Sequence, residues 1–378
     1  MLSFTHRGQS VSLHAGEAWT PAVTEETYRD APAKELWEIV KSIRAGQPWR
    51  EVVASRYAKS NPWLHQIVTS PKRDLFFREH PPKPGAKVLD IGSGWGQIAL
   101  PLARDTHAEV VALEPTPERL AFIQAVAQQE GTAKRMNFIQ GDFFDIAFGH
   151  TQSAPDSSVK RSPVDVSPSS PSDAHEVRPS TNAPLPIAHR PSPIFDLVTC
   201  VGVLEWVPKF RSGNPRDVQI EFLQRARSLL APGGQLVIGI ENRLGLKYLL
   251  GAPDDHIGPP NIAVYDATLA SEKWLKQSGQ PLRSFTFTRA ELTELLSAAG
   301  FGSTTFYAAL PDYKLPELIL PLGTATNDHF ATGKYIPEHD GCNGHPLAIQ
   351  SELRSHYRSL AHLGIASDFA PSFFVVTS

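Results

Sequence analysis

The chain has 378 residues, of which 41% are hydrophobic and 20% are charged. This length allows one elaborated domain or a domain with extensions, and the composition is that of a folded protein rather than a disordered or fibrous one. The 36 Lys and Arg residues nearly balance the 39 Asp and Glu residues. No overall charge therefore favours nucleic acid or an anionic membrane, and we expect no nucleic-acid partner.

Membrane and secreted classes are also disfavoured. No hydrophobic run approaches the roughly 18 to 20 residues of a membrane-spanning helix, and the opening residues, MLSFTHRGQS, lack the apolar core of a signal peptide. The two cysteines, Cys200 and Cys342, are too few for a disulfide framework or a zinc site built from cysteine. We therefore expect a cytoplasmic protein without a membrane span.

The periodicity of the remaining sequence predicts helices and strands in alternation. In chain order, we expect two short helices within residues 33–58, a strand at 88–91, a helix at 97–104, a strand at 109–113, a helix at 117–130, strands at 137–139 and 195–201, a helix at 218–230, a strand at 235–240, a helix at 288–299, and strands at 303–308 and 373–377. Thr288 and Glu291 have the spacing of a capping box at the start of the last helix. This alternation predicts an α/β fold with a doubly wound, mostly parallel sheet.

Residues 151–193 interrupt this pattern, because they are rich in proline and serine and contain no aromatic side chain. Such a segment cannot bury enough apolar surface to offset the entropy of ordering it, so it predicts a disordered insertion. An expanded surface loop adds little closure entropy. A docking or phosphorylation segment is the alternative.

The turn after the first buried strand is rich in glycine. It reads VLDIGSGWG over residues 88–96. Glycine lets the backbone turn sharply and approach a ligand closely, and the N–H groups of a following helix attract anions. Gln97 stands where a dinucleotide-binding fold would have its third glycine. By itself, the turn indicates either a ligand cradle or tight packing of the helix.

Acidic residues follow the next two strands. Glu114 ends the second strand, where a carboxylate can accept hydrogen bonds from both hydroxyls of a ribose. Asp142 follows the third strand, where it can accept from an exocyclic amine such as that of adenine. Because ligands of open α/β sheets bind at the carboxyl ends of the strands, these residues together predict a nucleoside-containing ligand.

With these motifs the sequence resembles the class I S-adenosylmethionine-dependent methyltransferases. VLDIGSGWG is similar to the first motif of the family, ALEP to the second, GDFF to the third and FDLVTCVGVLEWVP to the fourth. The resemblance implies S-adenosyl-L-methionine as the cofactor and a seven-stranded, mostly parallel Rossmann-like sheet whose last strand, in PSFFVVTS, is antiparallel. The cofactor-binding residues that it implies are Asp90, Gly92, Ser93, Gly94, Gly96, Glu114, Pro115, Asp142, Phe143, Cys200, Val201 and Gly202.

A narrower resemblance concerns the acceptor of the methyl group. IENRLGLKYLLGAPDDHIG at 240–258, PDYKLP at 311–316 and SPKRDLFF at 70–77 are similar to bacterial methyltransferases associated with the synthesis of surface polysaccharides. This implies a hydroxyl of a small molecule or glycan, such as a nucleotide sugar, as the acceptor. A protein or nucleic-acid methyltransferase, or a non-catalytic cofactor-binding module of a polysaccharide assembly complex, is the alternative. The motif Asn/Asp-Pro-Pro-Tyr/Phe of many amino-methylating enzymes is absent, since Val203-Leu204-Glu205-Trp206 stands in its place.

Two segments are expected to cover the acceptor. Residues 241–285 are far longer than the usual strand-to-helix loop of ~2 to 6 residues, and such excess length is often functional. We expect residues 1–80 to form a helical extension or lid and residues 81–378 to form the methyltransferase domain, with 241–285 as an acceptor-side lid. The acceptor-binding candidates are Glu205, Trp206, Asn242, Tyr248 and Asp255.

The catalytic candidates are His256 and Glu241. Histidine is the commonest general base near neutral pH, and an oxygen acceptor gains from such a base. His256 could otherwise be a solvated loop residue, and Glu241 could position the acceptor or cap a helix. Asp254, Asp255 and His256 could also bind a metal ion, but three adjacent residues rarely form a site alone, so no metal is expected.

Overall fold

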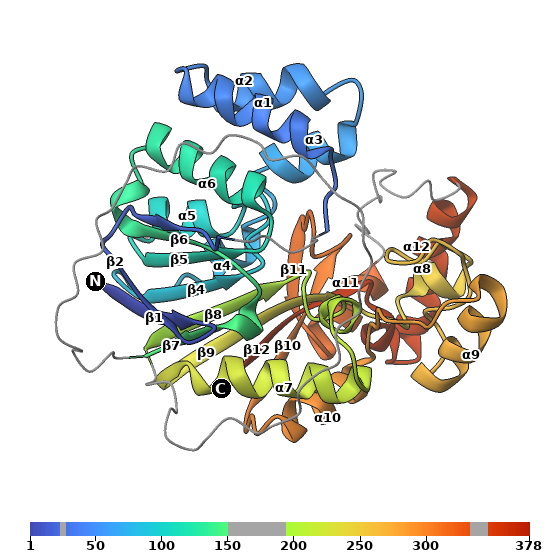
Figure 1. Ribbon diagram of the computed structural model, residues 1–378. Helices are drawn as coiled ribbons and strands as arrows, with labels where there is room; N and C mark the ends of the chain where they lie inside the picture. Colours follow the sequence, from blue (N-terminus) through green and yellow to red (C-terminus); the bar gives the residue numbers. More distant parts are fainter. Residues whose placement is uncertain (23–27, 150–193, 333–346) are drawn as a thin grey trace.

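A mixed sheet forms the centre of the protein, for which a computed structural model describes residues 1–22, 28–149, 194–332 and 347–378 (Figure 1). The predicted insertion at 151–193 lies outside the described residues. The strand order is β11-β10-β12-β9-β8-β4-β5-β6-β3. These strands are β3 (Ala18–Trp19), β4 (Lys87–Ile91), β5 (Glu109–Glu114), β6 (Met136–Gln140), β8 (Phe195–Val201), β9 (Leu230–Glu241), β10 (Thr304–Leu310), β11 (Leu318–Pro321) and β12 (Ser372–Thr377).

The direction of the strands confirms the predicted sheet. All neighbours from β3 to β9 are parallel, and β12 runs antiparallel to both β9 and β10. Two short strands extend the expected seven: β3 pairs with β6 at one edge, and β11 pairs antiparallel with β10 at the other. The carboxyl ends of β4, β5, β6, β8 and β9 therefore lie along one edge of the sheet.

Helices cover both faces of the sheet, as alternating strand residues require. Val88 belongs to the core beneath one helical layer, and its neighbour Leu89 belongs to the core on the other face. The first layer contains α1 (Ala33–Arg44), α2 (Trp49–Tyr57), α3 (Pro62–Thr69), α4 (Leu75–Glu79), α5 (Ala99–Asp105) and α6 (Pro117–Gln129), and the second contains α7 (Pro215–Ser228) and α10 (Arg289–Ala298). The predicted capping box is present, because Thr288 and Glu291 each accept a hydrogen bond from the other's backbone N–H.

The first residues of the chain form strands, which the sequence analysis missed. β1 (Leu2–His6), β2 (Gln9–Leu13) and β7 (Ile146–Phe148) make a separate three-stranded antiparallel sheet. Arg7 and Gly8 connect β1 to β2 with φ angles of 47° and 83°, the left-handed backbone that suits a two-residue hairpin. The helical expectation for residues 1–80 is therefore correct at α1 to α4 and wrong at the hairpin and at β3.

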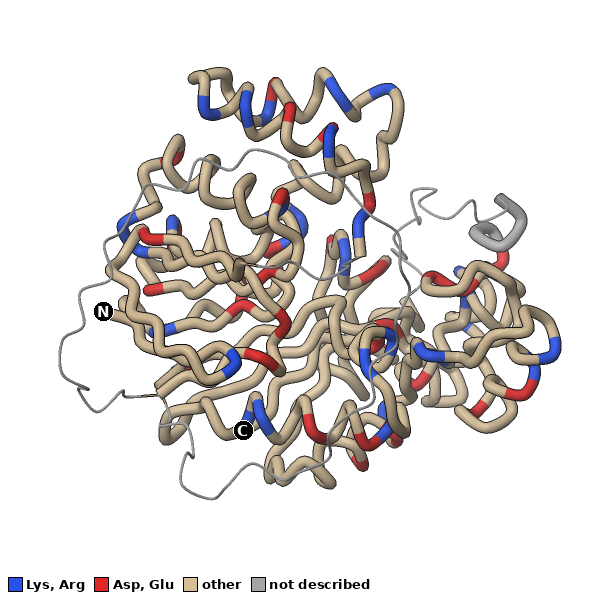
Figure 2. Tube along the Cα trace, in the orientation of Figure 1, with Lys and Arg blue, Asp and Glu red and all other residues tan. Residues whose placement is uncertain are grey.

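The segment 241–285 contains α8 (Leu246–Leu249) and α9 (Ala267–Ser278). A small core joins Leu246 of α8 to Phe330 of α11 (Thr324–Thr332) and Tyr357 of α12 (Leu347–His362). Figure 2 shows acidic and basic residues interspersed along the chain. Within the described ranges, no helix combines the length and the hydropathy needed to cross a bilayer.

Candidate active site

A cavity of about 390 Å³ opens at the carboxyl ends of β4, β5, β6 and β8. The motifs identified in the sequence converge there. Of the residues that the sequence indicated, those lining the cavity are Gly92, Gly94, Glu114, Pro115, Asp142, Phe143, Val201, Gly202 and Trp206. Asp90, Ser93, Gly96 and Cys200 lie behind this surface.

The glycines of the first turn serve two purposes. A Cβ atom at Gly92 would lie 2.6 Å from Cγ2 of Val203, and one at Gly96 would lie 2.8 Å from Cδ1 of Leu100. Both positions therefore need glycine for packing, which is the alternative that the sequence left open. Gly94 lines the cavity, as Gly92 does, but has no such close neighbour, so its backbone is free to approach a ligand.

Asp90 lies beneath the cavity with one oxygen unsatisfied. Its Oδ1 accepts a hydrogen bond from Oγ1 of Thr199 at 2.6 Å, whereas its buried Oδ2 accepts none from the described residues. Burial raises the pKa of Asp90 to about 6, against hydrogen bonds from Thr199 and Ser93 that lower it. A buried carboxylate oxygen without a donor fits a cationic group, such as the ammonium of a bound S-adenosyl-L-methionine.

Glu114 is held rigidly at the end of β5. Its Oε2 accepts from the Gly94 N–H at 2.8 Å and its Oε1 accepts from the Thr116 N–H at 3.0 Å. Burial raises the pKa of Glu114, whereas Arg119 and these hydrogen bonds lower it. Because a carboxylate oxygen can accept a second hydrogen bond, Glu114 can still take both ribose hydroxyls.

Asp142 caps the turn after β6. Its Oδ1 accepts from the Phe144 N–H at 2.8 Å and lies 3.1 Å from Arg211. The neighbouring Phe143 ring is buried and packs on Phe222 at a centroid distance of 5.0 Å. Asp142 thus stays on the cavity surface, where an adenine amine could reach it.

Cys200 does not present its side chain to the cavity. Alternation along β8 directs Val201 to the cavity and Cys200 into the core of the opposite face. Burial raises the pKa of this thiol well above its usual value. The expected role of Cys200 is therefore limited to its backbone.

The N-terminal segment contributes cavity residues that the sequence analysis missed. Tyr28 stacks on Trp206 at a centroid distance of 5.5 Å, and Asp30 pairs with Arg119 at 2.8 Å. Arg73 lines the cavity and donates to the carbonyl of Lys314 at 3.1 Å. Arg73 belongs to the SPKRDLFF motif, so that motif was a usable signal.

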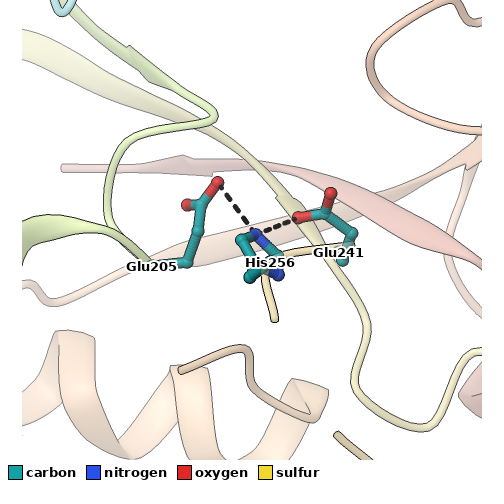
Figure 3. A group of neighbouring side chains, drawn as sticks. All are labelled: Glu205, Glu241 and His256. Carbon is teal, nitrogen blue, oxygen red and sulfur yellow. Dashed lines mark ion pairs between the residues drawn. The ribbon is translucent and has the colours of Figure 1, made fainter. Parts of the chain in front are cut away.

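Next to the cavity, three predicted residues form a buried cluster of charges (Figure 3). Nε2 of His256 lies 3.6 Å from Oε1 of Glu205 and 3.5 Å from Oε2 of Glu241. The His256 side chain is 5% exposed and both glutamates are fully buried. Burial lowers the pKa of His256, but Glu241, Asp254 and Glu205 outweigh it and raise the pKa to about 10. His256 is therefore neither a solvated loop residue nor a neutral base at pH 7 in this state.

The loop after β10 completes this cluster with residues that were not predicted as site residues. Nζ of Lys314 contacts Oε1 of Glu241, and the Tyr313 hydroxyl donates to Oε1 of Glu205 at 3.5 Å. The Tyr313 hydroxyl also lies close to Gly202, because a Cβ there would be 3.0 Å from it. Tyr313 therefore lies between the cluster and the 390 Å³ cavity, which is called the cofactor cavity below.

Three predicted acceptor-binding residues, Asn242, Tyr248 and Asp255, line neither of the two cavities next to the cluster, although a carboxylate oxygen of Asp255 lies within 4.8 Å of one of Glu241 in the cluster. The Asn242 amide donates to the carbonyls of Asp368 and Ala370 at 2.9 and 2.8 Å. The Tyr248 hydroxyl donates to Asp255, whose carboxylate lies 2.8 Å from Nζ of Lys247. These contacts fix loops in place, so the structure offers no support for direct contact with an acceptor.

A second cavity, of about 280 Å³, lies under the segment 241–285. Its lining includes His256, Asp254, Tyr265 and Phe285. The His256 ring packs on Trp206 at a centroid distance of 4.9 Å, and Trp206 lines the first cavity. The charged cluster thus lies at the boundary between the two cavities.

Comparisons with known proteins agree with this architecture. The family model described as "Methyltransferase domain" matches residues 64–304. A sterol 24-C-methyltransferase from Gibberella zeae is 36% identical over 66 residues, which are 18% of this chain and 17% of that protein. The ribosomal RNA small subunit methyltransferase G of Mycobacterium ulcerans is 50% identical over 50 residues, which are 13% of this chain and 29% of that protein. The chain thus spans less than a third of either relative.

Solved structures of low sequence identity and low TM-score are also similar to this chain. Phosphoethanolamine N-methyltransferase 2 of Haemonchus contortus is 12% identical with a TM-score of 0.41, over 90% of this chain and 59% of that one. A putative O-methyltransferase of Nostoc punctiforme is 15% identical with a TM-score of 0.39, over 74% and 68% of the two chains. Such distant likenesses indicate no acceptor. The family match covers more than half of the chain, which therefore belongs to the methyltransferase domain family.

Proposed function

We propose that this methyltransferase transfers the methyl group to a hydroxyl oxygen of a small molecule or glycan, with a sugar hydroxyl in polysaccharide synthesis as the first candidate. The observation that supports an oxygen acceptor is the buried cluster of Glu205, Glu241 and His256 beside the cofactor cavity. A hydroxyl must lose a proton as it is methylated, and this cluster supplies carboxylates where the proton leaves. The reaction is expected in the cytoplasm, with no nucleic-acid partner.

The chain's own residues would align the acceptor and take its proton. S-adenosyl-L-methionine, when bound, supplies an electrophilic methyl group on a sulfonium. The acceptor hydroxyl would take up this methyl group and give its proton to a residue of the chain. We assign the proton to Oε2 of Glu205, because this buried oxygen accepts no hydrogen bond from the described residues and Glu205 adjoins Trp206 at the cavity. Tyr28 and Trp206 would exclude water and hold the acceptor in line.

The test is a screen of purified full-length protein against nucleotide sugars and glycans. We expect release of S-adenosylhomocysteine with an acceptor whose product carries a new O-methyl group by mass spectrometry and NMR. Methylation of nitrogen in proteins or nucleic acids, with none on hydroxyls, would overturn the proposal.

We further propose that Asp90, Glu114 and Asp142 bind the cofactor. Replacing Glu114 by alanine should weaken S-adenosyl-L-methionine binding by about 1 to 3 kcal/mol, because the ribose hydroxyls of the bound cofactor would be left without their hydrogen-bond acceptor. Calorimetric titration measures this change. Glu109→Ala, at the exposed start of the same strand, is the matched control and should bind normally. Unchanged affinity in a folded Glu114→Ala protein would remove Glu114 from the site.

Cofactor affinity should also depend on pH through Asp90. Its pKa of about 6 means that the carboxylate is ionised above that pH and protonated below it. If the ionised form attracts the cofactor's ammonium, affinity should fall about tenfold from pH 7 to pH 5, since each pH unit below the pKa costs about a factor of ten. Asp90→Asn should bind weakly at both pH values. Equal wild-type affinity at both would contradict this role.

A further inference from the structure

The charged cluster brings together ligand groups from three separate segments. Glu205 follows β8, Glu241 ends β9, and His256 lies in the loop between α8 and α9. One ligand atom of each lies within 4.8 Å of the other two. Figure 3 shows both carboxylates directed at the same nitrogen of the imidazole ring.

Glu241 has a buried oxygen with no donor. Its Oε1 contacts Lys314, but its Oε2 accepts no hydrogen bond from any described residue and faces Nε2 of His256. Glu205 likewise has a donor on Oε1, the Tyr313 hydroxyl, and none on Oε2. Burying carboxylate oxygens without donors is costly. Without a metal ion, the protonated His256 is paired with both carboxylates, and a metal ion would take the place of the proton on Nε2.

The distances suit a metal ion. Metal bonds of about 2.1 Å to nitrogen and oxygen place tetrahedral ligands roughly 3.4 Å apart, and the two contacts to Nε2 of His256 are 3.6 and 3.5 Å. The other ring nitrogen, Nδ1, lies 3.5 Å from Oδ1 of Asp254. A histidine that binds a metal usually has its second nitrogen on a carboxylate in this way.

We propose that Nε2 of His256, Oε1 of Glu205 and Oε2 of Glu241 form a site for a divalent transition-metal ion, with zinc or manganese as the first candidates. Imidazole together with carboxylates suits these ions. No metal was expected from the sequence, because the adjacent residues 254–256 rarely form a site alone. Two of the ligands proposed here come from elsewhere in the chain: Glu205 follows β8 and Glu241 ends β9. The binding of the ion is independent of the proposed function. Its further role, which would be to polarise an acceptor hydroxyl at an open position, rests on that function.

The test measures metal binding without an acceptor. Full-length protein is freed of metal with a chelator, the chelator is removed, and Zn²⁺ or Mn²⁺ is titrated by calorimetry, with elemental analysis after dialysis. We expect about one ion per chain, and affinity at least about tenfold lower in Glu241→Gln and His256→Gln, the loss usual for altering a metal site. His356→Gln, at an exposed histidine of α12, should bind like the wild type.

Three outcomes would overturn the site: no stoichiometric binding by the wild type, binding that folded Glu241→Gln and His256→Gln retain, or binding that His356→Gln loses. If the site variants do not fold, Co²⁺ absorption by the wild-type protein decides, because imidazole and carboxylate ligands at low coordination number give a spectrum unlike that of hydrated Co²⁺. The same experiments distinguish failure of the proposed function from failure of the metal site. Metal binding without any O-methylation would remove the hydroxyl acceptor, and O-methylation that metal removal leaves unchanged would remove only the metal's role.

Discussion

Replacing His256 by alanine is expected to lower turnover on the true acceptor by about 10²-fold or more, the usual loss when a group that acts on the reacting proton or charge is removed. The reason is geometric. His256 is the cation, or the ligand of a cation, that holds the buried carboxylates of Glu205 and Glu241 beside the cofactor cavity. Without it, the two carboxylates repel each other and the acceptor loses its fixed surroundings.

Cofactor affinity should be unchanged in this variant, because His256 does not line the cofactor cavity. Steady-state kinetics and calorimetry separate the two effects. His356→Ala is the control for an arbitrary loss of histidine. If His256→Ala turns over within about threefold of the wild type, His256 only packs against Trp206 and has no part in the reaction.

Local patterns were sufficient to predict several elements around the first cavity. The glycine turn, the acid at the end of β5 and the capping box of α10 each depend on residues close in sequence, and each stands where it was expected. The same reasoning could not show that, of the two cavity glycines, Gly92 also packs closely on Val203 whereas Gly94 does not. That distinction depends on a side chain more than a hundred residues away.

The acceptor side could be predicted only in part. His256 and Glu241 were singled out separately, but their convergence with Tyr313 and Lys314 comes from packing the loop after β10 against the end of β9. No period or spacing encodes that contact. The polar run PDYK was noted only as a resemblance, although a run of polar residues directly after a buried strand was itself a signal.

The hairpin at the start of the chain shows a different limit. The alternation in LSFTH and QSVSL is short, and Arg7-Gly8 is not one of the strongest hairpin signals, such as Asn-Gly. β1 also depends on pairing with β7, which follows it in the chain only after six α-helices and four strands of the main sheet. The β1–β2 hairpin therefore depends on its pairing with β7, because the local sequence does not predict it.

The buried lysine of α8 should contribute strongly to stability. Lys247 is 2% exposed, and its Nζ lies 2.8 Å from Asp255 and 3.5 Å from Asp312. Burial lowers the pKa of Lys247, but the two aspartates outweigh burial and raise it, so the lysine is charged. Its ammonium ties the segment that carries His256 to the loop that carries Lys314.

Lys247→Met is therefore expected to lower the free energy of unfolding by about 3 to 5 kcal/mol, the range for removing one partner of a buried ion pair. The cost arises because Asp255 and Asp312 keep their buried charges after losing this lysine, with Lys314, 4.0 Å from Asp312, as a remaining cation. Urea denaturation at neutral pH measures it. Arg56→Met removes the half-exposed pair with Glu38 and should cost less than about 1 kcal/mol. Adding Asp255→Asn and Asp312→Asn to Lys247→Met should recover much of the loss. A loss below about 1 kcal/mol in Lys247→Met would mean that water reaches the carboxylates. The segment 241–285 would then be held by its other contacts, such as the hydrogen bonds of Asn242 and the apolar core shared with α11 and α12.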